Sequence, residues 1–318
     1  MDDTKQKPAT GGMTRRGALS CLAWGGTGLL WTMAGGVPVA SILSGTAQAA
    51  DMAKDAGAFR FVQISDTHIG FNKDVNPDVP GTAKAAIDLI NTGAPDAALV
   101  LHTGDITHLS KPAEFDAAAE ILKGIKITDV HYVPGEHDVL DQSQTAFFDR
   151  YGKPSGGKGY YSFDHGGVHF IALINVIDFK PGSQARLGTQ QLEWLEADLK
   201  GRPASQPLVI FTHIPLWSLY PQWGWSTEDW PQAMDYVKRF GSVTVLNGHI
   251  HQVVQKVEGT VRYYSARSTA YPQPAPGQGD GPGPLKVPAD QLRSVLGVRR
   301  LEIVNASAPL AITDTALG

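Results

Sequence analysis

Cysteine is almost absent from this sequence, since Cys21 is the only one among 318 residues. A single cysteine excludes a disulfide framework and a zinc site built from thiolates. Charge of either sign is also restrained: 27 lysines and arginines stand against 31 aspartates and glutamates, and no block of five like charges occurs. A dedicated nucleic-acid-binding protein usually carries a basic excess, so we expect no nucleic-acid binding.

Histidine, by contrast, occurs ten times. Imidazole is the commonest transition-metal ligand, so this is the first indication of chemistry. With 42% hydrophobic and 18% charged residues, the composition is that of an ordinary globular protein. The length suits one large domain or two small ones.

The N-terminal segment has the features of an export signal. Residues 1–16 are polar and end in Thr14-Arg15-Arg16, residues 17–50 carry no charge, and Ala47-Gln48-Ala49 is an A-x-A cleavage site. The arginine pair before a modest apolar region resembles a twin-arginine (Tat) signal. We therefore expect residues 1–49 to be a Tat-type signal peptide recognised by the Tat export machinery, and the protein to be periplasmic or extracellular.

An uncleaved membrane anchor is the alternative for this segment, because the uncharged run is long enough to span a bilayer. It would make the chain a tethered interaction protein. The glycines, Pro38 and the cleavage site favour removal, so we expect no stable membrane anchor. Residues 1–49 carry a net charge of +2 and the whole chain −4, so the mature chain would have −6 and no cysteine.

Apolar strand-like segments alternate with helical ones from residue 59 onward. This rhythm predicts βαβ units with right-handed crossovers. We find no linker within residues 50–318 and expect a single domain, with a Pro/Gly-rich loop at 272–288. The expected strands are 59–65, 97–103, 130–134, 160–163, 168–176, 208–212, 243–246, 253–257, 261–265 and 298–304, and the expected helices are 82–90, 114–122, 190–199 and 232–240.

Five short polar motifs follow expected strands. Each is weak alone, since a single histidine on a turn is usually a surface residue. Ligands of an open α/β sheet gather at the carboxyl ends of strands, so the five together predict one site. The motifs are Asp66-Thr67-His68, Gly104-Asp105, Gly135-Glu136-His137-Asp138, Thr212-His213 and Gly248-His249-Ile250-His251.

This order of motifs, from Asp66 to His251, resembles the calcineurin-like metallophosphoesterases. The resemblance implies an α/β fold, a two-sheet αββα sandwich with a dinuclear metal site at its edge. It also implies hydrolysis of phosphodiester or phosphomonoester bonds by metal-activated hydroxide. We therefore expect a small phosphoester substrate.

The resemblance also assigns roles to the matching positions. Asp66, His68 and His251 would hold the first metal, Asp105 would bridge both, and Glu136, His213 and His249 would hold the second, with His137 as the catalytic residue beside the phosphate. Mixed imidazole and carboxylate ligands suit iron, zinc or manganese. Two such ions about 3.5–4 Å apart can generate a hydroxide and neutralise phosphoryl oxygens.

Glu136 departs from the family pattern, which has asparagine there. The additional carboxylate makes the site less positive, so we expect either a preference for monoanionic diesters or one trivalent ion. Alternatively, Glu136 points away, and the chain is a catalytically degenerate metal- or ligand-binding module on the same fold. His108 is a second departure, since purple acid phosphatases have tyrosine and protein Ser/Thr phosphatases aspartate there; it could act from behind the ligands.

Four tryptophans crowd the segment after His213. They could form an aromatic wall over the site, which would favour a nucleotide-like or aryl substrate. Core packing is the equally weighted alternative. The four are Trp217, Trp223, Trp225 and Trp230.

Overall fold

The computed structural model describes residues 29–34, 37–42, 58–140, 145–304 and 310–318. The chain divides into two compact units, Met1–Ala50 and Asp51–Gly318. In the first, β1 (Leu29–Ala34) and β2 (Val37–Ile42) pair antiparallel. The predicted arginine pair and cleavage site lie outside the described residues. Among described helices, none has the length and apolar character needed to cross a membrane.

The second unit contains two mixed β-sheets. The first has the order β13-β12-β3-β4-β5 and the second β10-β11-β9-β8-β7-β6. The first comprises β3 (Phe59–Ile64), β4 (Leu99–His102), β5 (Val130–Tyr132), β12 (Gly297–Ile303) and β13 (Ala311–Ala316). The second comprises β6 (Tyr161–His165), β7 (Val168–Ala172), β8 (Leu208–Phe211), β9 (Val243–Asn247), β10 (Val254–Glu258) and β11 (Val261–Ser265).

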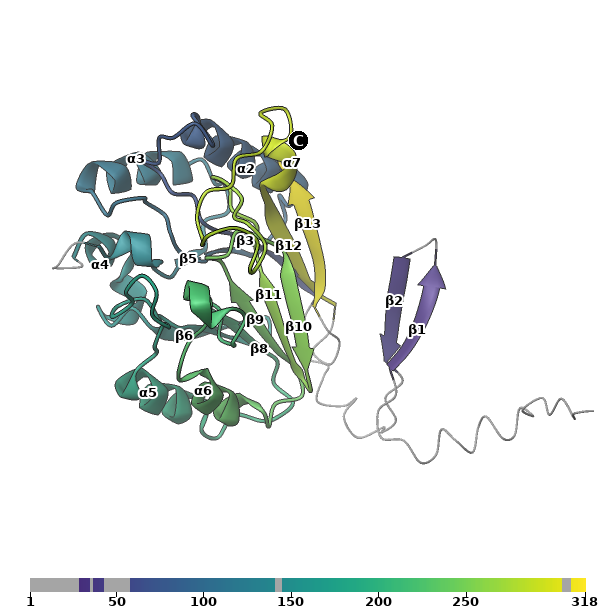
Figure 1. Ribbon diagram of the computed structural model, residues 1–318. Helices are drawn as coiled ribbons and strands as arrows, with labels where there is room; N and C mark the ends of the chain where they lie inside the picture. The colour runs from purple at the N-terminus through teal and green to yellow at the C-terminus, as the bar shows by residue number, and fades with distance from the viewer. Residues whose placement is uncertain (1–28, 35–36, 43–57, 141–144, 305–309) are drawn as a thin grey trace, which may run out of the picture. The chain divides into compact units, whose positions relative to one another are not determined.

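Helices cover the outer face of each sheet (Figure 1). Against the first sheet lie α2 (Val79–Gly93), α3 (Pro112–Leu122) and α4 (Thr145–Tyr151), and against the second lie α5 (Thr189–Leu199) and α6 (Trp230–Val237). One turn of helix, α7 (Leu292–Val295), precedes β12. The helix expected at 82–90 starts earlier, at Val79, because the Asp78 side chain accepts a hydrogen bond from Gly81 N at 2.9 Å and caps it.

Alternation along the central strands accounts for the layers. In β4, Leu99 and Leu101 face the core between the sheets, whereas Val100 faces α2 and α3. Successive side chains of a strand point to opposite faces, so a continuous apolar run is buried on both. In β8, Val209 and Phe211 likewise face the intersheet core. These cores define an αββα sandwich, and the predicted fold class is confirmed.

Parallel pairing places the polar motifs at neighbouring sheet ends. In the first sheet β3, β4 and β5 run parallel, and in the second β8 and β9 run parallel. The carboxyl ends of parallel neighbours share one edge of a sheet. Each of these five strands is followed by one of the predicted motifs.

Candidate metal centre

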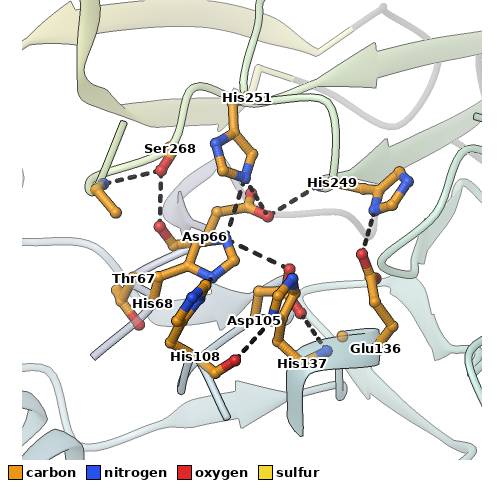
Figure 2. A network of polar contacts seen from close by, with 12 residues as sticks. Asp66, Thr67, His68, Asp105, His108, Glu136, His137, His249, His251 and Ser268 are labelled. Atoms are coloured by element: carbon orange, nitrogen blue, oxygen red, sulfur yellow. Dashed lines mark hydrogen bonds and ion pairs between the residues drawn. The ribbon is translucent and has the colours of Figure 1, made fainter. Parts of the chain in front are cut away.

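All seven predicted ligand side chains converge in one buried cluster at the strand ends. Six are at most 6% exposed, and Glu136 is partly buried. Figure 2 shows most of them pointing toward a common centre. Overlapping groups of three or more metal-ligating atoms, all within 4.8 Å of one another, include every one of the seven: Asp66, His68, Asp105, Glu136, His213, His249 and His251.

One group comprises Asp66, His68 and His251 (Figure 2). Nε2 of His251 lies 3.2 Å from Nε2 of His68 and 3.3 Å from Oδ1 of Asp66. Two imidazole nitrogens and a carboxylate oxygen at this spacing can share one metal ion. These are the three residues to which the family resemblance assigned the first metal.

The second group comprises Glu136, His213 and His249. Oε2 of Glu136 lies 3.0 Å from Nε2 of His213, and Oε1 lies 3.0 Å from Nδ1 of His249. The carboxylate therefore points into the cluster. This orientation argues against the alternative in which Glu136 faces away and leaves the site degenerate.

Asp105 lies between the two groups. Its Oδ2 is 3.4 Å from Nε2 of His68 and 3.3 Å from Nε2 of His213. Its other oxygen, Oδ1, accepts the backbone N–H of His137 at 2.9 Å. A carboxylate with one oxygen close to both groups occupies the position that a bridging ligand requires.

Backbone carbonyls fix the tautomers of two histidines. Nδ1 of His213 lies 2.7 Å from the carbonyl oxygen of Thr103, and Nδ1 of His251 lies 2.6 Å from that of Tyr271. A carbonyl oxygen only accepts, so each Nδ1 carries the hydrogen and donates. Nε2, the nitrogen that would bind a metal ion, then faces the cluster in both histidines.

Several buried polar atoms in the cluster have no hydrogen-bond partner within the described part of the chain: Oδ2 of Asp66, Oε2 of Glu136 and Nε2 of His213. Oε2 of Glu136 and Nε2 of His213 are close but do not have hydrogen-bond geometry. Buried polar groups are rarely left unpaired, because desolvation without a partner is costly. The donor set therefore fits divalent metal ions.

The backbone is strained at the same positions. Of the six non-glycine residues with positive φ in the described chain, five are predicted ligands: Asp66, His68, Asp105, His249 and His251, with φ between 41° and 67°. Such conformations cost on the order of 1–3 kcal/mol each and cluster at functional sites. The fold thus holds the ligand positions against local preference.

The electrostatics keep the carboxylates charged. Burial raises the pKa of Glu136, but the imidazoles of His249 and His213 outweigh it and hold that pKa well below its usual value. Burial likewise opposes ionisation of Asp66, yet His251 and His213 leave its pKa lowered. Burial, with His137 and His251 nearby, lowers the pKa of His68 well below normal, which keeps that imidazole neutral and able to bind a metal.

A scan against protein-family models matches residues 59–253 to the calcineurin-like phosphoesterase model. The chain belongs to the calcineurin-like phosphoesterase family. This match covers the five motifs, and it confirms the predicted phosphoesterase at the level of the family.

Two curated members of this family are similar over part of their length. A 3',5'-cyclic-nucleotide phosphodiesterase of Nostoc sp. is 29% identical over 216 residues, covering 66% of this chain and 77% of that protein. A probable cyclic nucleotide phosphodiesterase of Rhodopseudomonas palustris is 28% identical over 162 residues, covering 49% of this chain and 57% of that protein. The chain thus spans little more than half the length of the second relative.

Among solved structures, a dimetal phosphatase from Danio rerio has the same fold. It superposes with a TM-score of 0.57 at 14% identity, covering 80% of this chain and 98% of that chain. At this identity the likeness concerns the αββα fold alone.

In the present chain, His137 and His108 form a stacked pair beside the cluster. Nδ1 of His137 donates to the carbonyl oxygen of His108 at 2.6 Å, and the rings lie 4.9 Å apart at 15°. Burial lowers the pKa of His137, but Asp105 and Glu136 outweigh it and leave that pKa raised, which favours a proton donor. Nδ1 of His108 is 3.4 Å from Nδ1 of His68, so His108 lies behind a predicted ligand.

A cavity of about 360 Å³ opens beside Glu136, His137 and His249. The tryptophans of the segment after His213 divide between the two roles that the sequence left open, an aromatic wall at the site and core packing. Trp223 and Trp225 line this cavity, whereas Trp217 and Trp230 pack with the core beneath α5 and α6.

Proposed function

We propose that the protein hydrolyses phosphodiesters with two divalent metal ions bound at the strand ends. One would be held by Asp66, His68 and His251, the other by Glu136, His213 and His249, and Asp105 would contact both. When bound, such a pair of ions supplies a hydroxide nucleophile and neutralises phosphoryl charge. Iron, zinc and manganese suit this ligand set.

His137 would act on the leaving group. Its Nδ1 is held by the His108 carbonyl, so Nε2 is the atom left for a substrate oxygen. The raised pKa of His137 keeps a proton available there. A positioned imidazole that protonates the departing oxygen contributes typically about 10²–10⁴-fold to a rate.

The direction of the Glu136 carboxylate is the observation that carries the diester preference. It faces His213 and His249 at 3.0 Å each, so it adds a negative charge where asparagine would add none. A less positive site binds a monoanionic diester better relative to a dianionic monoester. The cyclic-nucleotide phosphodiesterases among the relatives support the same choice and a small, nucleotide-like substrate.

Hydrolysis of bis-p-nitrophenyl phosphate and of p-nitrophenyl phosphate tests this function. The chain is reconstituted separately with manganese, zinc and iron, and its metal content is measured. We expect two ions per chain, faster turnover of the diester, and its loss in His137→Ala. Two bound ions without turnover of either ester would instead support the metal-binding module.

We also propose export by the Tat route, on the strength of Arg15-Arg16 and the Ala47-Gln48-Ala49 site. The test is fractionation of cells that express wild type or the Arg15→Lys/Arg16→Lys variant. Wild type should appear outside the cytoplasm with an N-terminus near residue 50. The variant should stay inside at full length, and equal distribution of the two would contradict the proposal.

A further inference from the structure

The cavity beside the cluster has an apolar wall. Ile177, Phe179 and Trp223 line it, and each is partly exposed. The Phe179 ring stands edge-on to His249, with centroids 6.0 Å apart at 86°. The wall therefore adjoins the half of the cluster that contains Glu136 and His249.

The Pro/Gly-rich loop forms another side of the cavity through Pro282, Gly283 and Pro284. Gln273 attaches this loop to the cluster: its Nε2 donates to the carbonyl oxygen of His249 at 2.8 Å, and its Oε1 accepts the Gly283 N–H at 3.2 Å. The Gln273 amide is thus engaged on both ends. The loop is therefore fixed relative to a predicted ligand.

Charged groups are scarce around this cavity. Among the described residues that line it, Lys73 is the single lysine or arginine and Glu136 the single carboxylate. A substrate with several phosphates needs more cationic contacts than one lysine supplies. An uncharged substituent fits the lining better, because apolar surface removed from water favours binding.

A donor is nevertheless present in the apolar surroundings. Trp225 lines the cavity and is fully buried, and its indole Nε1 has no hydrogen-bond partner in the described chain. Buried indole N–H groups usually find an acceptor. Its ring meets Trp223 edge to face, with centroids 5.1 Å apart at 87°. The buried Trp225 ring therefore packs against the partly exposed Trp223 ring in the cavity wall.

We propose that this cavity is a subsite for one uncharged aromatic substituent of a phosphodiester, with Trp223 and Phe179 as the specificity-determining residues. The proposal rests on the proposed function, because it takes the phosphate to bind at the cluster. It commits to an aryl ring or nucleobase on the ester. It excludes a second phosphate group in this cavity.

Calorimetric binding of diphenyl phosphate and dimethyl phosphate to the metal-loaded chain tests the subsite without turnover. Both are monoanionic diesters, so they differ in the substituents alone. We expect wild type to prefer the diphenyl ester about tenfold or more, the scale of one aromatic stacking contact. The preference should fall below about threefold in Trp223→Ala, on the same scale. The control Trp230→Ala removes a tryptophan of the same segment that does not line the cavity, and it should retain the preference.

Equal binding of the two esters by wild type would overturn the subsite, as would an unchanged preference in Trp223→Ala. Phe179→Leu is the second variant and guards against misfolding of the first. It should weaken binding of the diphenyl ester and leave binding of the dimethyl ester unchanged. Turnover of bis-p-nitrophenyl phosphate, measured separately, reports on the proposed function. A preference for the diphenyl ester without turnover would support the subsite and contradict the proposed hydrolase.

Discussion

Oε1 of Glu136 lies 3.0 Å from Nδ1 of His249. The same carboxylate reaches Nε2 of His213 with its other oxygen. One side chain thus adjoins two of the imidazoles that would hold a metal ion. Its charge would act directly on such an ion, which makes Glu136 the residue whose replacement most directly tests the diester preference.

Replacing this carboxylate by a neutral amide should shift substrate preference. In Glu136→Asn we expect the ratio of diester to monoester hydrolysis to fall about tenfold. Tenfold corresponds to about 1.4 kcal/mol, which is a fraction of the roughly 4 kcal/mol by which two unit charges interact at about 4 Å near a protein surface. Rates on both p-nitrophenyl esters measure it, with metal content determined in parallel. Glu196→Asn, an exposed position on α5, is the control. The same ratio and metal content in Glu136→Asn and wild type would refute the charge argument.

Removal of metal should destabilise the chain. Among the described residues, Oδ2 of Asp66, Oε2 of Glu136 and Nε2 of His213 have no hydrogen-bond partner. A ligand present at a thousand times its Kd stabilises a protein by about 4 kcal/mol. A chelator should therefore lower Tm by roughly 10 °C for a domain of this size. Two equivalents of manganese or zinc should restore it. In His213→Ala, metal should not raise Tm in the same way, whereas in the control His165→Ala it should. A wild-type Tm that chelator leaves unchanged would count against the metal centre.

A glycine in the third motif is required by close packing. A Cβ at Gly135 would meet the carboxylate of Asp105 and lie 2.5 Å from its backbone nitrogen. Gly135→Ala should therefore displace the predicted bridging ligand, reduce metal content below two ions per chain and abolish turnover. Gly281→Ala is the matched control, since a Cβ there meets nothing within 4 Å. The metal content of both variants is measured. Equal metal content would show that the chain tolerates a Cβ at residue 135 close to Asp105.

The site was predictable because its residues are local to strand ends. Motifs such as Asp66-Thr67-His68 follow apolar runs, and parallel strands bring their carboxyl ends to one edge. The apolar run of β4 indicated a strand buried on both faces, whereas the two-sheet arrangement was predicted through the family resemblance. Among the α-helices and strands described in the second unit, three were missed: α4 and α7 are only seven and four residues long, and β13 is an edge strand with mixed polarity.

Side-chain direction was not accessible from the sequence. The sequence left open whether Glu136 faces the cluster, because that depends on contacts with His213 and His249 from another sheet. Nor did any pattern separate Trp223 from Trp217, since burial of an aromatic ring is decided by tertiary packing. The network around His169 carried no signal either, because its partners lie on separate elements.

That network predicts a pH-dependent contribution to stability. His169 contacts Asp198 at 2.7 Å and Asp164 at 2.9 Å, and Ser162 donates to Asp198 at 2.7 Å. Burial raises the pKa of Asp198, but His169 and Ser162 outweigh it and leave that pKa lowered. A lowered folded pKa stabilises above the unfolded value of about 3.9, and this contribution is lost as pH falls through the folded pKa.

Asp198→Asn should therefore be less stable than wild type at pH 7, by about 1 kcal/mol for this partly exposed group. The difference should shrink below about pH 4, where wild type also loses the charge. Urea unfolding at a series of pH values measures it. Asp235→Asn, at an exposed position of α6 whose carboxylate pairs with Lys238, is the control. A difference that stays constant down to about pH 3 would contradict the assignment.

Gln273 offers a last test, of the link between the Pro/Gly-rich loop and the cluster. Gln273→Met keeps the side-chain length but removes both hydrogen bonds, to the His249 carbonyl and from the Gly283 N–H. The loop then loses these two contacts, although Gln252 still donates to the carbonyl oxygens of Gln273 and Pro274. We therefore expect the preference for diphenyl over dimethyl phosphate to fall roughly three- to tenfold, the scale of one or two hydrogen bonds. Metal content should remain that of wild type, since no proposed ligand changes. Gln278→Met, an exposed position in the same loop, is the matched control. If Gln273→Met and Gln278→Met show the same preference for diphenyl over dimethyl phosphate, Gln273 does not hold the subsite in place.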